Sequence, residues 1–520
     1  MKNNTLILTL ILFTTSSFTQ RLDSLKYIST FEKYVFNKKD SLNYKDSYFE
    51  SLFSIDSTAK LKSVLLQKDF TDKFISNLDR DKINKSKNKK KIKYLFNKIH
   101  DNFLIKYENI VNFNKIFDDG RYNCVSASAL FAYVFDSFNI PYQIKETPTH
   151  IYLIAFPNES NIYVETTIPG NKGFYSPSEN DIKKSVDELI NNKIITQIEV
   201  NKTGYKEAYL NFFYEKDFLK PSELIGVQYY NEGINYFQNE NYEKAFYNFS
   251  KAEKFYNTKK VKYLKLSCLS LMLTKSNFNE TKDLITITTL LNNLKYNKDF
   301  VKKDLGYYSS NLILANENNE EFLILATKYF EKIENIEVAK VLNKDLFKYI
   351  AETRYNLDKN LDDILKYALK VYHLEKNNEH IQNLISKSIL KKYFYTTPNK
   401  KTVQKIEEYE IKYPFLNKSI FYTKYMIRVY SYMTSQYYYK KEPQVGSLYF
   451  DKLTELINNN KKEIELDQEL IGNTYWSIGA YYYGKSKLEK AKKILEEGKK
   501  YAPEHHKLNK ILSYVNDDLK

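Results

Sequence analysis

A pattern of small and bulky residues occurs twice in this chain of 520 residues and restricts its fold more than any other feature. The two stretches are residues 225–258 and 472–505. In both, small residues alternate with rings or leucines at the same spacing: Gly233, Tyr236, Tyr242, Ala245, Phe249 and Ala252 in the first, and Gly479, Tyr482, Leu488, Ala491, Leu495 and Gly498, then Pro503, in the second. Small residues let two helices cross closely while rings fill the gaps, so the pattern predicts stacked helix pairs.

This spacing resembles the tetratricopeptide repeat (TPR) of roughly 34 residues. Composition agrees, because 12 glycines and 10 prolines against 48 tyrosines and 33 phenylalanines are typical of long helices packed on helices. Residues 346–378 and 419–458 have the pattern of degenerate helix pairs, and about seven to nine units would fill residues 221–520. We expect an all-α solenoid whose concave face binds a protein or peptide partner, although unrelated helical hairpins remain an alternative.

The first residues have the features of a secretory signal peptide. Lys2 precedes an apolar run from Leu6 to Phe13, and small residues follow at Ser17 and Thr19. The run is too short to span a bilayer, and no later apolar stretch is long enough for a membrane helix. We therefore expect residues 1–19 to be removed and the protein to be exported, periplasmic or secreted, soluble and without an integral membrane segment.

The net charge of +16 arises from 80 basic residues interspersed with 64 acidic ones, a pattern typical of a solvated surface. The densest basic run, residues 82–93, lacks aromatic residues at a fixed offset, so no nucleic-acid binding is predicted. No cluster of His, Cys and Asp has the spacing of metal ligands, so we expect neither a metal nor a cofactor.

Residues 118–167 carry the candidate chemistry. Asn123 is a plausible N-cap, and Cys124 then opens a helix over 124–138 that Pro141 cannot continue. Two strands are predicted, over 149–156 and 161–167. If the loop between them is even, Tyr152 pairs with Glu165, and His150 then shares a face with Glu165. An odd loop would place them on opposite faces.

These residue types suit a thiol active site. A helix N-terminus and a neighbouring imidazolium both favour the thiolate. Cys124 would be the nucleophile, His150 the general base and acid, and Glu165 the residue that orients the imidazole. The backbone N–H of Cys124 would stabilise an oxyanion, and the side chains of Asn123 and Tyr122 are candidates for the second donor.

Each of these residues also has a simpler interpretation. A cysteine at a helix start is more often a small buried hydrophobe, and Glu165 alone would fit a solvated strand edge. Cys268 lies in a buried-looking helix stripe and is predicted to be core. Of the six histidines, only His100 and His150 fall within residues 20–220, and His100 is predicted to be exposed on a lysine-rich helix.

The order of these residues resembles the core of the transglutaminase-like superfamily. That core has a Cys at a helix start, a Gly-Ile-Pro-type turn, a His opening a strand and an Asp-Pro-Thr-like element on the next strand. Cys124, residues 139–141, His150 and residues 165–167 correspond to these. The resemblance implies an α+β papain-like domain over residues 20–220, followed by the all-α TPR-type solenoid over 221–520.

The sequence departs from this family at several positions. Asn123 stands where Gly is common, no tryptophan follows Cys124 or accompanies His150, and the third residue is Glu rather than Asp. These departures leave the substrate class open.

Two hypotheses follow. The first is an exported thiol enzyme acting on peptide or amide bonds, with water as acceptor (a protease or amidase) favoured over an amine (a transglutaminase). The second is a catalytically inactive domain in a TPR scaffold that binds other proteins.

Overall fold

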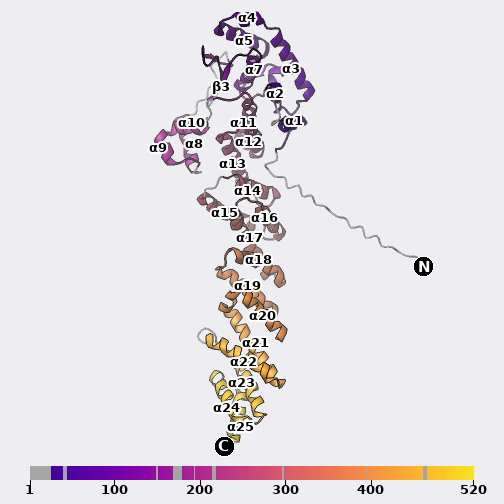
Figure 1. Cartoon of the computed structure of the whole chain (residues 1–520), viewed down its shortest axis with the longest axis vertical. Helices are drawn as coiled ribbons and strands as arrows, with labels where there is room; N and C mark the ends of the chain where they lie inside the picture. The colour runs from indigo at the N-terminus through magenta and orange to yellow at the C-terminus, as the bar shows by residue number, and fades with distance from the viewer. Residues whose placement is uncertain are drawn as a thin grey trace, which may run out of the picture. The chain divides into compact units, whose positions relative to one another are not determined.

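The computed structural model describes residues 25–38, 44–147, 150–167, 178–191, 194–213, 218–294, 298–394, 396–460 and 465–520 (Figure 1). The predicted signal peptide, residues 1–19, lies outside these ranges. The chain divides into two compact units. The first is Met1–Ala315 with Lys332–Asn335, and the second is Asn316–Glu331 with Ile336–Lys520.

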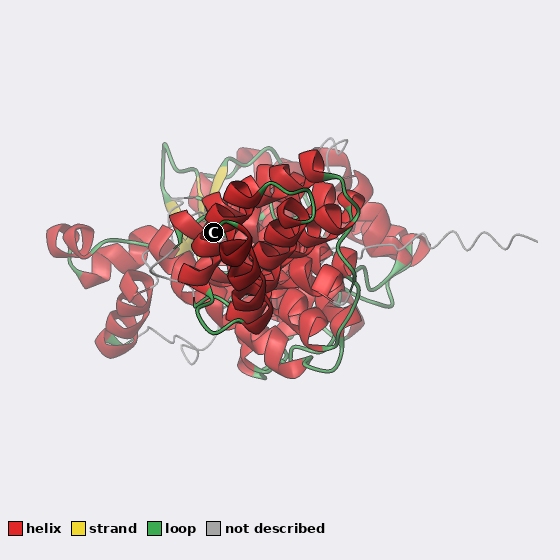
Figure 2. Ribbon diagram, turned by 90° about the horizontal axis from the view of Figure 1, so that it is seen from below, coloured by secondary structure: helices red, strands yellow, loops and turns green. Residues whose placement is uncertain are grey.

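The predicted α+β papain-like fold is wrong. Helices make up 72% of the structure and strands only 4%, so the strands are too few for such a core (Figure 2). One reason is local: residues 198–200, which include the β-branched Ile198 and Val200, lie in helix α9 (Gln197–Thr203) and not in a strand. There the Thr196 hydroxyl accepts from the backbone N–H of Glu199, while the Glu199 carboxylate accepts from that of Thr196. This capping box starts a helix despite the β-branched residues that follow.

The elements before Glu223 are called the head. Its helices besides α9 are α1 (Thr30–Lys38), α2 (Tyr44–Ser51), α3 (Leu61–Ser76), α4 (Arg80–Lys85), α5 (Asn88–Phe103), α6 (Lys115–Asp118), α7 (Cys124–Ser137), α8 (Glu179–Asn191) and α10 (Tyr205–Phe213). Helix α7 is the most apolar of them and is almost fully buried along its length. Phe131 of α7 contacts Phe96 of α5, with ring centroids 5.6 Å apart. The residue that opens α7 is therefore held by a rigid core helix.

Two small sheets flank α7. In the first, β1 (Lys106–Tyr107) lies parallel to β2 (Arg121–Tyr122). In the second, β4 (His150–Ala155) pairs antiparallel with both β3 (Tyr142–Thr147) and β5 (Ile162–Val164). The β4–β5 register pairs Leu153 with Val164, which confirms the predicted even loop.

The elements from Glu223 onward are called the helical array. In the first unit they are α11 (Glu223–Gln238), α12 (Tyr242–Phe255), α13 (Lys259–Thr274), α14 (Thr281–Asn293) and α15 (Lys298–Ala315). In the second unit they are α16 (Glu320–Phe330), α17 (Ile336–Asn356), α18 (Leu361–Leu374), α19 (Glu379–Phe394), α20 (Lys400–Lys412), the short 3₁₀ helix η2 (Pro414–Lys418), α21 (Ile420–Tyr439), α22 (Pro443–Asn459), α23 (Gln468–Tyr483), α24 (Leu488–Tyr501) and α25 (His506–Asp518). Neighbouring helices such as α11 and α12, or α23 and α24, pack on each other. The array is thus compatible with a helical-repeat scaffold.

The two stretches that share the sequence pattern also share a packing contact. A Cβ atom on Gly233 of α11 would lie 2.7 Å from the Phe249 ring of α12. The equivalent Gly479 of α23 faces Leu495 of α24 in the same manner. In both pairs, glycine lets a large side chain of the second helix sit against the first helix.

Replacing Gly226 by alanine is expected to lower the free energy of unfolding by about 1–3 kcal/mol through overpacking. Its Cβ would lie 2.5 Å from Cβ of Tyr256 and 2.7 Å from the Tyr256 backbone nitrogen, so no flexible side-chain end can give way. Gly306 of α15 is the control, because a Cβ atom added there would have no neighbour within 4 Å; Gly306→Ala should gain up to about 1 kcal/mol from helix propensity. Urea unfolding measures both, and equal stability of the two variants would contradict the close packing of α11 on α12.

Two buried ion pairs join the head to the array within the first unit. Lys260 Nζ of α13 lies 2.8 Å from Glu146 Oε1 of β3, and Lys251 Nζ of α12 lies 2.7 Å from Glu32 Oε1 of α1. Both pairs are almost excluded from solvent. Tyr256 also donates its hydroxyl to Glu146, so the carboxylate has two partners. The head is thereby fixed to the start of the array.

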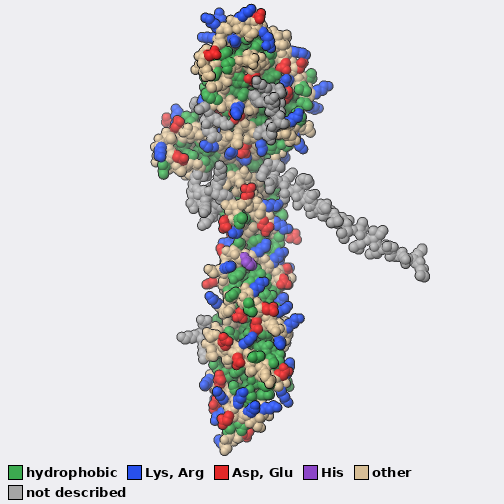
Figure 3. All heavy atoms as spheres, in the orientation of Figure 1, with side chains coloured by type: hydrophobic (Ala, Val, Ile, Leu, Met, Phe, Trp, Pro, Cys, Tyr) green, Lys and Arg blue, Asp and Glu red, His purple; other side chains and the backbone are tan. Residues whose placement is uncertain are grey.

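On the face that Figure 3 shows, basic and acidic side chains are interspersed along the array, as the sequence predicts. Within the described ranges, no helix has both the length and the apolar character needed to cross a membrane.

Candidate thiol active site

Cys124 is the first residue of α7, as predicted from the sequence. Asn123 precedes it in an extended conformation, and its Oδ1 accepts from the backbone N–H of Ser126 at 2.9 Å. The Ser126 hydroxyl in turn accepts from the N–H of Asn123 at 2.9 Å. This reciprocal cap fixes where the helix begins, so Cys124 lies where the unpaired N–H groups and the helix dipole favour a negative charge.

The two cysteines have opposite environments. Cys124 is partly exposed, whereas Cys268 of α13 is fully buried. Burial raises the pKa of the Cys268 thiol to about 12, so it stays protonated and inert. Of the two thiols, Cys124 is therefore the one that solvent can reach.

His150 links Cys124 to Glu165. It opens β4, is 8% exposed, and its Nε2 lies 2.7 Å from both carboxylate oxygens of Glu165. The His150 side chain also has a hydrogen bond with Cys124. Because Glu165 occupies Nε2, the nitrogen left for the thiol is Nδ1. The three predicted residues thus lie in one chain of contacts: Cys124 from the start of α7, His150 from β4, and Glu165 directly after β5, on the side of His150 that the register gives.

The charges of this group support each other. Burial lowers the pKa of His150, but the hydrogen bonds and negative charges of Cys124 and Glu165 outweigh it and raise this pKa to about 9. Burial raises the pKa of Glu165, yet its bonds with His150 and Thr167 prevail and hold this pKa below its ordinary value. Thr167 contributes both its hydroxyl, at 2.7 Å, and its backbone N–H, at 3.2 Å. At neutral pH an imidazolium therefore lies between a carboxylate and the sulfur.

The other two predicted residues have different tasks. Asn123 donates its side-chain N–H₂ to the carbonyls of Val111 and Asn109, at 2.9 and 3.3 Å, and its Oδ1 caps α7. Its side chain is committed within the protein and has no donor for a substrate. Tyr122 is only 3% exposed. Neither residue suits the role of second oxyanion donor.

Two residues near the site were not predicted from the sequence. Tyr107 of β1 lies opposite Tyr122 of β2, with ring centroids 5.9 Å apart, and is 37% exposed. Burial, then the charges of Cys124 and Glu165, raise the pKa of Tyr107 to about 12. A parallel pairing of two residues leaves no alternating pattern, so the sequence had no signal for it.

The second unpredicted residue is His100, which was expected to be exposed. Its ring is half-buried and lies against Phe96, with centroids 4.3 Å apart, and against Phe131 and Tyr122 at 6.0 Å. Burial lowers the pKa of His100, although a bond to the backbone of Thr166 acts in the opposite direction. The ring of His100 thus forms part of the aromatic packing between α5, α7 and β2. The sequence feature that could have predicted this burial is the position of His100 one turn after Phe96, on the buried side of α5.

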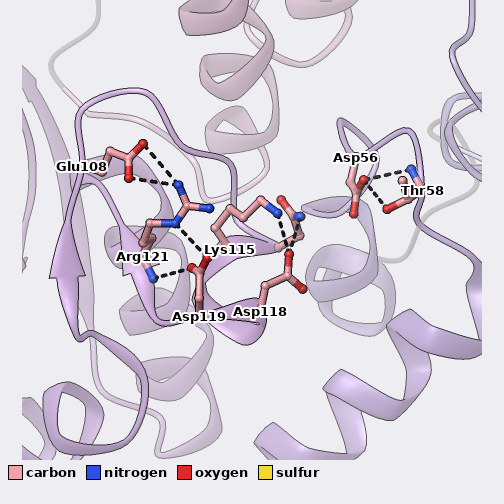
Figure 4. Close-up of polar contacts among 8 residues, drawn as sticks. Asp56, Thr58, Glu108, Lys115, Asp118, Asp119 and Arg121 are labelled. Atoms are coloured by element: carbon pink, nitrogen blue, oxygen red, sulfur yellow. Dashed lines mark hydrogen bonds and ion pairs between the residues drawn. The ribbon is translucent and has the colours of Figure 1, made fainter.

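An ion-pair cluster braces the ribbon that leads into Cys124 (Figure 4). Arg121 of β2 bonds Glu108 through Nη1 at 3.1 Å and Asp119 through Nε at 2.9 Å, and Lys115 bonds Asp118 at 2.8 Å. Half-exposed pairs such as these stabilise a protein by only about 0–1 kcal/mol each. The pair of Arg121 with Glu108 joins β2 to the residue that follows β1, whereas the other two pairs are local to residues 115–121.

Among the described residues, no group of three or more His, Cys, Asp or Glu side chains is arranged to hold a metal ion. No protein-family description, characterised protein or solved structure matches this chain. The function must therefore be argued from the site itself.

Proposed function

We propose that this chain is a thiol enzyme that cleaves peptide or amide bonds through a thioester on Cys124. The observation that carries the proposal is the continuous contact from Cys124 through His150 to Glu165. A thiolate at a helix start, an imidazolium beside it and a carboxylate that fixes the ring supply the nucleophile, the proton carrier and the residue that orients it.

The reaction would begin when the Cys124 thiolate attacks the carbonyl carbon, forming a C–S bond while the carbonyl π electrons move to oxygen. Collapse of this intermediate breaks the C–N bond, and the amine leaves with the proton of the His150 imidazolium. Water then attacks the thioester and gives a proton to His150. Release of the acid restores the thiolate and the imidazolium. Hydrolysis is preferred to amine transfer because water is always present.

We further propose that the helical array is a TPR-type solenoid that holds the protein or peptide substrate, or a partner, on its concave face. The repeated glycine contacts of Gly233 and Gly479 support this proposal. The signal-like residues 1–19 support export to a periplasm or the extracellular space.

Iodoacetamide labelling at pH 5 to 6 tests the thiol pair. An ordinary thiol is only roughly 0.03–0.3% deprotonated there, so a thiolate held by His150 should react about tenfold faster or more, even after allowance for its weaker nucleophilicity. We expect rapid labelling of Cys124 in the wild type, loss of this rate in His150→Ala, and an intermediate rate in Glu165→Gln, which keeps a hydrogen-bonding oxygen but not the charge.

Cys268 is an internal control, because it should label only after unfolding. If all three proteins label Cys124 alike at pH 5 to 6, the enzyme proposal fails, and the array becomes the working part of an inactive scaffold.

A further inference from the structure

Thioester formation on Cys124 would place a negative charge on the carbonyl oxygen of the substrate, and this oxyanion needs hydrogen-bond donors. The backbone N–H of Cys124 is one, since the first N–H groups of a helix have no partner within it. The donors expected from the sequence, on Asn123 and Tyr122, are committed or buried. A second donor must come from elsewhere.

We propose that the hydroxyl of Tyr107 is this second donor. The inference rests on the proposed function and assigns a specific residue to its first step. Tyr107 is in register with the nucleophile, because it lies opposite Tyr122, two residues before Cys124. The backbone N–H of Glu108 donates to the carbonyl of Tyr122 at 2.9 Å, which locks this alignment.

The surroundings of Tyr107 suit a donor that acts on a substrate. Its side chain is 37% exposed, so an incoming carbonyl group can reach it, whereas the neighbouring Tyr122 is enclosed. The ion pair of Arg121 with Glu108 adds a further contact between the two strands of the ribbon. The tyrosine is therefore positioned before substrate arrives, as effective oxyanion stabilisation requires.

The electrostatics of the position agree with the geometry. Burial and the charges of Cys124 and Glu165 raise the pKa of Tyr107 to about 12, so the phenol keeps its proton at neutral pH. It therefore acts as a donor rather than as a base. When Cys124 attacks, the negative charge moves from sulfur to the carbonyl oxygen, and a proton donor on the strand paired with the segment that leads into Cys124 can stabilise that new charge.

Two reagents separate this role from a general effect on the thiol. Iodoacetamide alkylates Cys124 by displacement of iodide and forms no oxyanion, whereas p-nitrophenyl acetate must pass through one to acetylate the same sulfur. In Tyr107→Phe, we expect alkylation at pH 6 within about twofold of the wild type and acetylation slowed by about 10²- to 10³-fold. Both reactions are followed by mass spectrometry of the peptide that contains Cys124.

Tyr142→Phe is the matched control. Tyr142 bonds the exposed Asp136 near the far end of α7, about 20 Å from Cys124 by helix rise. The Tyr142→Phe variant loses a tyrosine hydroxyl, as Tyr107→Phe does, and its alkylation and acetylation rates should equal those of the wild type. Thermal unfolding of each variant checks that the fold is intact.

Acetylation of Tyr107→Phe within about threefold of the wild type would overturn the assignment. So would an equal fall in both rates, because Tyr107 would then act on the thiol pair and not on the oxyanion. Failure of the proposed function would give a different result. Cys124 of the wild type would then be alkylated no faster at pH 6 than Cys124 of His150→Ala, and the oxyanion role of Tyr107 would be rejected as well.

Discussion

Replacing His150 by alanine is expected to lower the steady-state hydrolysis of p-nitrophenyl acetate by about 10²- to 10⁴-fold, the range typical of a lost general acid–base group. Two steps suffer. Acylation slows because the imidazolium that favours the thiolate is gone. Deacylation slows because no base remains to accept the proton of the attacking water.

Under the proposed function, the contacts of His150 explain how one histidine can serve both steps. The pKa of His150 is raised to about 9 in part by the hydrogen bond and charge of Cys124. Both disappear when the sulfur is acylated, so the pKa of the ring falls in the thioester. His150 therefore changes from a proton donor to a competent base as the reaction proceeds. Glu165 remains bonded to Nε2 and keeps the ring in place.

Release of p-nitrophenolate gives the rate, and the mass of the Cys124 peptide identifies the acylated residue. Cys124→Ala should abolish the reaction, while Cys268→Ala should leave it unchanged, because that thiol is buried in α13. Turnover by His150→Ala within about threefold of the wild type would show that the ring has no part in catalysis. Addition of a primary amine distinguishes the acceptors, since a transglutaminase would form an amide at the expense of acetate.

Local features of the site were predictable from the sequence because their determinants are close together in it. Asn123 and Ser126 form the cap that places Cys124 at the start of α7, and both lie within four residues. The short loop after Phe156 sets the register of β4 and β5, which puts His150 and Glu165 on one face.

The surroundings of the site depend on distant contacts, and these were not predictable. Tyr107 reaches the site through a parallel pairing with Tyr122, and no local pattern indicates which segments pair in that way. The fold class failed for a related reason. The resemblance to the transglutaminase-like core covers only residues 118–167, whereas the rest of the head folds largely into helices whose capping signals, as at Thr196, outweigh short β-branched runs.

The second large expected effect concerns the buried ion pair between Lys260 of the array and Glu146 of the head. Lys260→Met is expected to lower the free energy of unfolding by about 3–5 kcal/mol, because it removes the cation from a buried carboxylate. The side chains of Lys260 and Glu146 are only 2% and 8% exposed, and 114 residues separate them in the sequence. Tyr256 would remain as a donor to Glu146, but one neutral hydrogen bond does not replace a neutralising charge.

A double variant separates the burial of charge from the loss of packing. In Glu146→Gln with Lys260→Met no charge is left uncompensated, so this protein should recover much of the stability that Lys260→Met loses.

Lys275→Met is the surface control: its pair with Glu240 is 53% and 68% exposed, and its loss should cost at most about 1 kcal/mol. Urea unfolding measures all three. If the double variant is no more stable than Lys260→Met, the penalty lies in the lost contacts of the Lys260 ammonium with the rings of Tyr230 and Tyr256 and not in the isolated carboxylate. Because Glu146 lies opposite Ile151 in the β3–β4 ladder, next to His150, the same ion pair also ties the array to the strand that carries His150.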